Sequence, residues 1–320
     1  MAGKAALYEG CVACGWAHDK QSRCCYSSHV KLFYAAHDRG VWAIGTDLIL
    51  KERPDEGLKN EAKTLELLTS HPNIPAPELV RDWVDRNSRY FVLQKRMDGD
   101  TLEEAWPTLS HEQKVVIADE VADIRKHLQS ITSSSIQGVD RSACSPALLF
   151  FDSEPRGPFH SDSELWDAIS LTLHNPPQRS FPHKAMDNLK KRFPKCAPYV
   201  LTHCDLNIEN IIVKDGRLVG ILDWEHAAYY PIWYEYISAT WGFGKEDVEW
   251  RRLLRQGLDT HEDAKSFWWI CFICEIIQTW MKEVKKSWND RLRSNDEYGF
   301  RYEFGLLLSI SGGKIRQKLG

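Results

Sequence analysis

Residues 203–213 read HCDLNIENIIV, and this stretch decides which fold the sequence predicts. Residues with imidazole, acid or amide groups fill its first part, and Ile211, Ile212 and Val213 end it. A run of β-branched apolar residues is typical of a buried strand, so the pattern predicts a polar loop held against such a strand. An ordinary turn that leads into a strand would show the same pattern, and the residues that follow distinguish the two.

A second apolar segment comes directly after the first one. Residues 214–217 read KDGR, and residues 218–226 read LVGILDWEH. Asp-Gly between two apolar segments is a strong signal for a tight β-hairpin, whose strands would begin beside Asn210 and end at Asp223. Because these two ends are neighbours in an antiparallel pair, we expect Asp205, Asn210 and Asp223 to converge. Carboxylate and amide oxygens are ligands that suit Mg²⁺.

The first 95 residues combine several strand-like segments with one helix. Strands are predicted at residues 29–34, 40–43, 47–51, 78–84 and 89–94, and a helix at residues 58–71. Lys51 closes an apolar strand and Glu61 lies on the helix that follows, although Glu66 on the same helix is an alternative partner. A lysine paired in this way is a cation held ready for phosphate oxygens.

Beyond residue 97 the pattern becomes mainly helical. Ser110 and Gln113 form a capping box for a long helix that runs to about residue 131, and helices rich in tryptophan follow near the C-terminus. The sequence therefore predicts an α+β fold with two lobes. Residues 1–97 would form a small antiparallel-sheet lobe, and residues 98–320 a larger, mainly helical lobe.

Composition excludes several classes of protein. The 320 residues carry a formal net charge of −4, which does not favour nucleic-acid binding, and no basic run indicates a membrane surface. The most apolar segment, residues 267–281, is interrupted by Glu275 and is shorter than the roughly 20 residues that span a bilayer. No signal peptide is recognisable at the N-terminus. We therefore expect a cytoplasmic protein that contacts neither nucleic acid nor membrane.

The nine cysteines do not indicate a disulfide framework, because their number is odd and no secretory signal precedes them. Cys11 and Cys14 form a C-x-x-C, and Cys24 and Cys25 follow within the extension of residues 1–28. This cluster is either a zinc site or a structural extension without metal.

Aromatic residues are frequent after the predicted hairpin. Trp233, Tyr234 and Tyr236 could form a cage for a cationic or flat ligand, but such residues at helical spacing more often belong to the core. Glu235 between them, and Glu275 further along, could bind a substrate amine or pair within the helical lobe. Both interpretations of Glu235 are open at this point.

These motifs resemble those of the aminoglycoside phosphotransferase family, within the protein kinase-like superfamily. His203, Asp205 and Asn210 match its pattern H-x-D-x-x-x-x-N, and Asp223 in ILDW stands where the metal-binding aspartate begins the DFG motif of protein kinases. The stretch DWEHAAYYPIWYEY is similar to the fungal branch of the family. The resemblance covers residues 30–288.

The resemblance implies a role for each residue of the loop and the hairpin. Asp205 would orient or deprotonate an acceptor hydroxyl, and His203 would brace the loop as structural support. Asn210 and Asp223 would hold Mg²⁺ on the phosphates of ATP. The acceptor would be a small molecule that carries a hydroxyl group.

The resemblance also implies how the N-terminal lobe binds ATP. Lys51, held by Glu61, would contact the α- and β-phosphates, and Gln94 to Met97 would form the hinge that receives the adenine. The protein would thus be a small-molecule kinase that moves the γ-phosphate to an alcohol group.

The sequence departs from the family in three places. Only Gly40 and Gly45 remain where a glycine-rich phosphate loop would lie, Cys204 replaces the glycine between the histidine and the aspartate, and residues 207–209 replace a step that usually contains Pro or Gly. Glu209 could add charge near the metal or point to solvent. The departures leave two alternatives: a nucleotide-binding scaffold without phosphoryl transfer, or a kinase-like fold recruited to another transfer reaction.

Overall fold

The computed structural model describes residues 30–36, 38–150, 152, 154–173 and 183–272. The Cys-containing extension of residues 1–28 therefore lies outside the described residues, as does Glu275. The chain divides into two compact units, and the elements below all belong to the larger one. Of residues 268–320, which belong to the other unit, only 268–272 are described.

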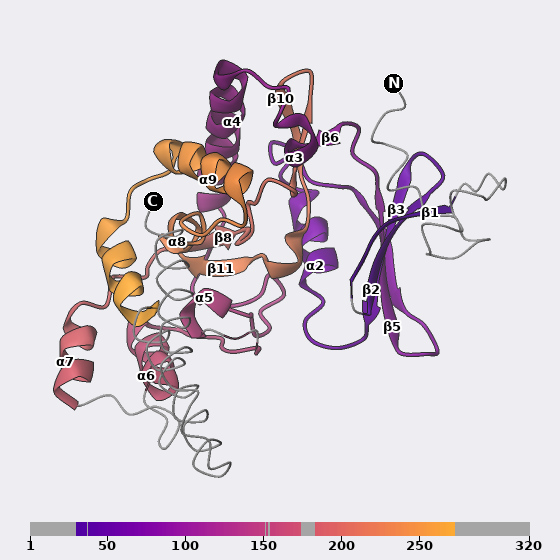
Figure 1. Ribbon diagram of the computed structural model, residues 1–320. Helices are drawn as coiled ribbons and strands as arrows, with labels where there is room; N and C mark the ends of the chain where they lie inside the picture. The colour runs from indigo at the N-terminus through magenta and orange to yellow at the C-terminus, as the bar shows by residue number, and fades with distance from the viewer. Residues whose placement is uncertain (1–29, 37, 151, 153, 174–182, 273–320) are drawn as a thin grey trace, which may run out of the picture. The chain divides into compact units, whose positions relative to one another are not determined.

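An antiparallel sheet forms the N-terminal part, as the alternating sequence predicts (Figure 1). Its strand order is β1-β2-β3-β5-β4. The strands are β1 (Val30–Ala36), β2 (Arg39–Ile44), β3 (Leu48–Pro54), β4 (Leu79–Val84) and β5 (Arg89–Lys95). Alternate residues of β5 are buried, namely Tyr90, Val92 and Gln94, which is the pattern of a strand with one face in the core.

One helix, α2 (Asn60–Leu68), packs against β4 of this sheet. Its buried apolar residues are Ala62, Leu65 and Leu68, which recur every three residues along the side that faces the core. Glu61 lies in the first turn of the helix and is buried. The sheet ends at Lys95, close to the lobe boundary predicted at residue 97, which stays a prediction.

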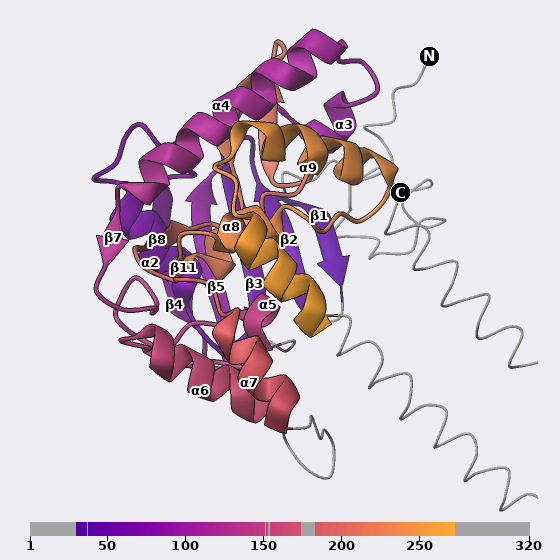
Figure 2. The ribbon, with the colours of Figure 1, turned by 90° about the vertical axis from the view of Figure 1, so that its left-hand side faces the viewer.

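Helices dominate the rest of the described chain, together with two small sheets (Figure 1 and Figure 2). The helices are α3 (Leu102–Ala105), α4 (His111–Gln129), α5 (Ala147–Phe150), α6 (Asp162–Leu173), α7 (His183–Lys191), the 3-10 turn η2 (Trp224–His226), α8 (Tyr234–Ser238) and α9 (Lys245–Gly257). The long helix α4 begins with the capping box that Ser110 and Gln113 predict. It packs against α9 and against the strand β8 (Tyr199–Thr202).

The two small sheets hold both ends of the segment formed by residues 203–213. One has the order β10-β9-β6 and the other β11-β8-β7. Their strands are β6 (Asp100–Thr101), β7 (Thr132–Ser133), β8, β9 (Ile211–Lys214), β10 (Arg217–Ile221) and β11 (Ala228–Pro231). The polar loop thus runs from buried β8 to buried β9, and β9 and β10 form the predicted hairpin.

The aromatic stretch after the hairpin belongs to the core rather than to a ligand cage. Trp233, Tyr234 and Tyr236 are all buried, and Tyr230 stacks on Tyr234 with ring centroids 4.3 Å apart. The described residues include no helix with both the length and the apolar character needed to cross a membrane.

Candidate active site

His203 lies at the base of the polar loop and is fully buried. Its Nε2 is 2.8 Å from the carbonyl oxygen of Leu222, and its Nδ1 accepts a hydrogen bond of 3.2 Å from the backbone N–H of Asp205. A carbonyl can only accept, so Nε2 carries the proton and Nδ1 is bare. The ring is therefore neutral, and burial lowers its pKa. An edge contact with Trp224, at 4.6 Å between centroids, fixes the ring further.

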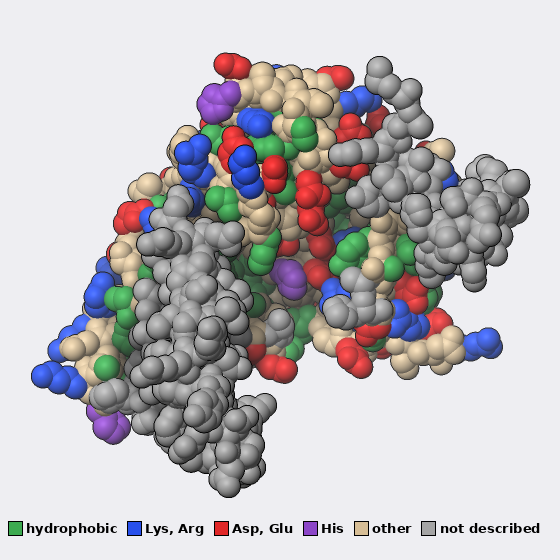
Figure 3. Space-filling model, viewed as in Figure 1, with side chains coloured by type: hydrophobic (Ala, Val, Ile, Leu, Met, Phe, Trp, Pro, Cys, Tyr) green, Lys and Arg blue, Asp and Glu red, His purple; other side chains and the backbone are tan. Residues whose placement is uncertain are grey.

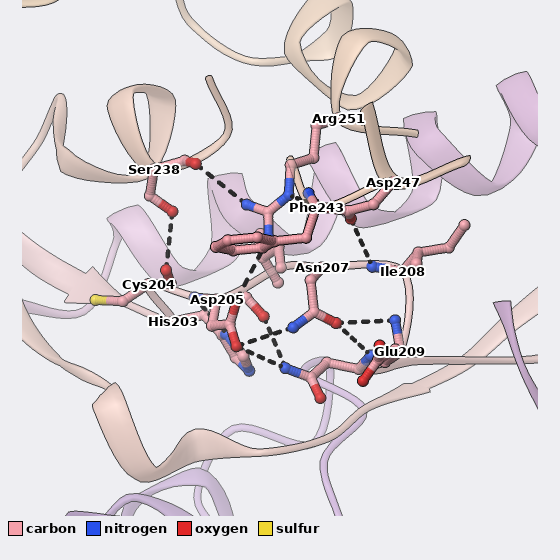
Figure 4. Close-up of polar contacts among 12 residues, drawn as sticks. His203, Cys204, Asp205, Asn207, Ile208, Glu209, Ser238, Phe243, Asp247 and Arg251 are labelled. Atoms are coloured by element: carbon pink, nitrogen blue, oxygen red, sulfur yellow. Dashed lines mark hydrogen bonds and ion pairs between the residues drawn. The ribbon is translucent and has the colours of Figure 1, made fainter. Parts of the chain in front are cut away.

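The Asp205 carboxylate is held from two sides (Figure 4). Its Oδ2 accepts hydrogen bonds from the amide nitrogens of Asn207 at 2.9 Å and of Asn210 at 3.1 Å. Its Oδ1 faces the Nη2 of Arg251 at 3.4 Å. The side chain keeps 34% of its surface exposed, so it is accessible from solvent.

The hairpin brings Asn210 to the end of β10. Ile211 pairs with Ile221, and the backbone N–H of Leu222 donates to the carbonyl oxygen of Asn210 at 2.8 Å. Asp223, the next residue, has a φ of 62°, in the left-handed region. Such strain in a residue other than glycine is often stored at functional sites. The hairpin therefore brings Asn210 next to the strand end that carries Asp223, as the sequence predicts.

Lys51 on β3 joins the sheet to this strand end. Its Nζ donates to Glu61 Oε1 at 2.5 Å and to Asp223 Oδ1 at 2.9 Å. Burial lowers the pKa of Lys51, but the two carboxylates outweigh burial and raise it. Burial raises the pKa of Asp223, and Lys51 more than reverses this, so that it falls below its usual value. Glu66, the alternative partner, lies on the exposed side of α2 with Lys63.

The donor set suits Mg²⁺ that is bound to a nucleotide better than Mg²⁺ alone. Within the part of the chain that the structure describes, no group of three or more His, Cys, Asp or Glu side chains could hold a metal ion. Asn210 commits its side-chain N–H groups to Asp205, and no described residue donates to its Oδ1. Mg²⁺ commonly takes one or two protein oxygens and completes its shell with water and phosphate. Asn210 and Asp223 fit that arrangement.

Cys204 occupies a backbone position made for glycine. Its φ is 77°, in the region that side chains of L-residues rarely adopt. Burial and the nearby Glu235 raise the pKa of its thiol well above the ordinary value. The side chain is therefore neutral, and the departure from the family's glycine costs backbone strain next to Asp205.

Glu235 on α8 pairs within the protein rather than with a substrate amine. It is only 1% exposed, and its Oε2 accepts hydrogen bonds from the backbone N–H groups of His203 at 2.9 Å and Cys204 at 3.3 Å. Its contacts fix the backbone that leads into Asp205. The second of the two interpretations of Glu235 is the one the structure bears out.

Arg251 and Asp247 on α9 support the loop and were not predicted (Figure 4). The buried Arg251 bonds through Nε to Asp247 Oδ2 at 2.9 Å, through Nη1 to the carbonyl of Ser238 at 3.1 Å, and reaches Asp205 with Nη2. Asp247 Oδ1 accepts the backbone N–H of Ile208 at 3.0 Å. The only sequence signal is an acid and a base one helical turn apart, a spacing that exposed helices share.

Glu209 points away from the hydrogen-bonded core of the loop. Its side chain is exposed, while its backbone N–H donates to Asn207 Oδ1 at 2.8 Å. Partial burial and the nearby carboxylates of Glu103, Asp205 and Asp247 raise its pKa. Its exposed carboxyl thus adds to the acidic surroundings of the loop.

Gln94 and Met97 lie at the end of β5 and just beyond it. Gln94 is buried, and its side-chain Oε1 makes no hydrogen bond to a described residue. Met97 packs so closely on Gly220 that a Cβ at that glycine would lie 2.0 Å from the Met97 Cε. The structure therefore places Met97 against the hairpin and Gln94 within the sheet, where it pairs with Ile49 and Leu79.

Acidic side chains gather where the sheet meets the helical part. Figure 3 shows them in a column down the middle of this face, with one histidine among them. The described contacts in this region link Lys51 with Glu61 and Asp223, and Asp205 with Asn210. Carboxylates gathered in this way favour a bound cation.

Comparisons with solved structures identify proteins of similar fold. A thermostable mutant of aminoglycoside phosphotransferase APH(4)-Ia, in a ternary complex with AMP-PNP and hygromycin B, has a TM-score of 0.51 at 16% identity, covering 77% of this chain and 93% of that chain. Aminoglycoside phosphotransferase APH(4)-Ia itself gives 0.51 at 16% identity, with 77% and 92% covered. These likenesses show a shared kinase-like fold.

Sequence comparison adds the family. No curated protein matches the chain. The protein-family model described as "Phosphotransferase enzyme family" matches residues 33–268. This range is most of the described chain and includes the polar loop, the hairpin and the strand that carries Lys51. The chain belongs to the phosphotransferase enzyme family.

Proposed function

We propose that the protein is an ATP- and Mg²⁺-dependent kinase that phosphorylates a hydroxyl group of a small molecule. The observation that carries this proposal is the pairing of Lys51 with Asp223, beside a loop in which Asn210 and Arg251 hold Asp205. Family membership and a solved neighbour that holds AMP-PNP with hygromycin B support the same two ligand classes.

Lys51 would bind the phosphates without leaving its partners. A lysine ammonium has three N–H donors, and Glu61 and Asp223 use two of them. The third is available for an oxygen of the α- or β-phosphate. Gln94 and Met97 would lie against the adenine, at the end of the same sheet. Asn210 and Asp223 would hold Mg²⁺, which supplies positive charge to the phosphate oxygens.

Asp205 would act on the acceptor. The acceptor's hydroxyl oxygen forms a new bond to the γ-phosphorus, the bond from that phosphorus to the bridging oxygen breaks, and ADP leaves. The hydroxyl proton passes to the Asp205 carboxylate. His203 would brace the loop through Leu222. Its ring is fully buried and its bare Nδ1 already accepts the Asp205 N–H, so it would serve as a support rather than as a base. Most of the catalysis would come from position and charge, as phosphoryl transfer requires.

The test is Asp205→Asn in a panel of hydroxylated metabolites with ATP and Mg²⁺, with product detected by mass. We expect the wild type to add one phosphate to one class of acceptor, and the variant to lose roughly a hundredfold or more of that rate. ATP should still raise the melting temperature of the variant. Asp98→Asn is the matched control, because Asp98 is an exposed aspartate paired with Lys214.

Three outcomes separate the alternatives. An unchanged rate in Asp205→Asn would show that Asp205 does not take part. Stabilisation of the wild type by ATP without any product would favour the nucleotide-binding scaffold. A product heavier by a nucleotide rather than by a phosphate would show a different transfer reaction.

A further inference from the structure

The connection between β1 and β2 is too short to cover phosphates with its backbone. β1 ends at Ala36 and β2 begins at Arg39, and these two residues pair across the antiparallel ladder. Only residues 37 and 38 connect the strands. In protein kinases a glycine-rich loop lies over the phosphates at such a place. Here the ladder continues to the turn, so the backbone groups of Ala36 and Arg39 belong to the sheet.

A second contact holds this turn in place. Arg89 on β5 bonds through Nη2 to the carbonyl oxygen of Asp38 and through Nε to Glu52 Oε1, the latter at 2.9 Å. The turn is therefore tied to the sheet from the strand two places away. The Asp38 carbonyl is thus committed to the sheet, and the side chains at this end are candidates to contact a nucleotide.

Arg39 is the side chain that reaches the right place. Its Nη1 donates to Glu225 Oε1 at 2.9 Å and to Oε2 at 3.0 Å. Glu225 lies two residues after Asp223, on the 3-10 turn that follows the metal-binding strand end. Two cationic side chains of the sheet, Lys51 and Arg39, thus form ion pairs with acidic residues that lie within residues 223–225.

Arg39 could exchange its contact with Glu225 for another anion at a small cost in free energy. Its side chain is 52% exposed and that of Glu225 24%, and exposed ion pairs are typically worth under about 1 kcal/mol. Arg39 uses only Nη1 on Glu225, and its Nε and Nη2 bond to no described residue. A guanidinium with free N–H donors can bind a phosphate through two parallel hydrogen bonds, in the same bidentate geometry in which it binds a carboxylate.

We propose that Arg39 is a ligand for the β- and γ-phosphates, that Glu225 holds it until the nucleotide binds, and that it replaces the missing glycine-rich loop. This inference rests on the proposed function, because it needs ATP at the Lys51 site. The competing explanation is that the Arg39–Glu225 pair only joins the sheet to the helical part, with no contact to nucleotide.

Calorimetric titration of the full chain with ATP and with AMP, both with Mg²⁺, tests the proposal. We expect Arg39→Met to weaken ATP about tenfold, which corresponds to one charge-assisted hydrogen bond, and to change AMP less than about twofold. Glu225→Gln should bind ATP as tightly as the wild type or more tightly, because Arg39 is then free. Arg39→Lys should fall between the wild type and Arg39→Met, since it keeps the charge but loses the fork.

Lys63→Met is the matched control, because Lys63 is another exposed cation of this part of the chain, paired with Glu66. It should bind both nucleotides as the wild type does. Melting temperatures without ligand show that each variant is folded.

Several results would overturn the inference. Unchanged ATP affinity in Arg39→Met would remove Arg39 from the phosphates. Equal losses for ATP and AMP, or equal changes in Arg39→Met and Glu225→Gln, would show that the pair acts by joining the two parts. If the wild type itself binds no ATP, the proposed function fails, whereas normal binding by the wild type and by Arg39→Met defeats this inference alone.

Discussion

Replacement of Lys51 by methionine should destabilise the protein as well as inactivate it. The change removes the Nζ that donates to Glu61 at 2.5 Å and to Asp223 at 2.9 Å. Hydrogen bonds to charged groups contribute about 1.5–3 kcal/mol each, and removal of one partner from a buried pair costs about 3–5 kcal/mol. Asp223 is 34% exposed and can be rehydrated, so the lower end applies. We expect a loss of about 3 kcal/mol in the free energy of unfolding, or roughly 5 °C in Tm.

The loss should depend on pH, in a direction that identifies its cause. Glu61 is left buried without a cation, and burial raises its pKa above the ordinary 4.5. A carboxyl with a raised pKa in the folded state contributes stability below pH 4.5, and this contribution disappears as pH rises through the folded value. The deficit of Lys51→Met relative to the wild type should therefore grow between about pH 5 and pH 8.

A second substitution separates this explanation from simple loss of packing. Glu61→Gln in the Lys51→Met background removes the unpaired charge and should recover about half of the loss. Thermal unfolding of the wild type, both single variants and the double variant measures the coupling. Lys63→Met, from an exposed pair, should cost under about 0.5 kcal/mol. A deficit of Lys51→Met that is independent of pH and not reduced by Glu61→Gln would refute the reasoning.

Two further predictions concern the loop. Cys204 has a φ of 77°, so Cys204→Gly should be more stable than Cys204→Ala by about 1 kcal/mol, the reverse of the usual order; urea denaturation that places alanine first contradicts this. Burial lowers the pKa of His203, so below pH 6.5 the unfolded chain binds a proton that the folded chain does not bind. The free energy of unfolding should therefore decrease as the pH is lowered, by up to about 1.4 kcal/mol per pH unit. His203→Gln should remove that part of the slope, and equal slopes of Tm against pH for both proteins would show that His203 does not titrate in this way.

The sequence predicts those parts of the site that neighbouring residues determine. Asp-Gly places the hairpin turn, and the pairing of β9 with β10 follows from it, so that the approach of Asn210 to Asp223 needs no distant contact. Sequence alone separates Glu61 from Glu66 poorly, because both lie on one short helix. The Lys51 contact decides it.

Distant contacts could not be predicted in this way. Arg39 meets Glu225 across 186 residues of sequence, and Arg251 meets Asp205 across 46. A buried arginine looks like a solvated one in a helix that also carries exposed charges. Only the packing of α9 against α4 places Arg251 beneath the loop. The fungal branch and the lobe boundary at residue 97 stay predictions.

The contacts of the Asp247 carboxylate determine which sequence changes the loop before α9 can tolerate. Its Oδ2 accepts hydrogen bonds from the backbone N–H of Phe243 at 2.9 Å and from the Nε of Arg251. Its Oδ1 accepts a hydrogen bond from the backbone N–H of Ile208. The loop before α9 is thus tied to the same group that positions the arginine on Asp205. The Phe243 side chain is 86% exposed and can be replaced without disturbing its backbone bond. Substitutions at that position should therefore be tolerated, whereas an insertion or deletion in the loop would be transmitted through Arg251 to Asp205.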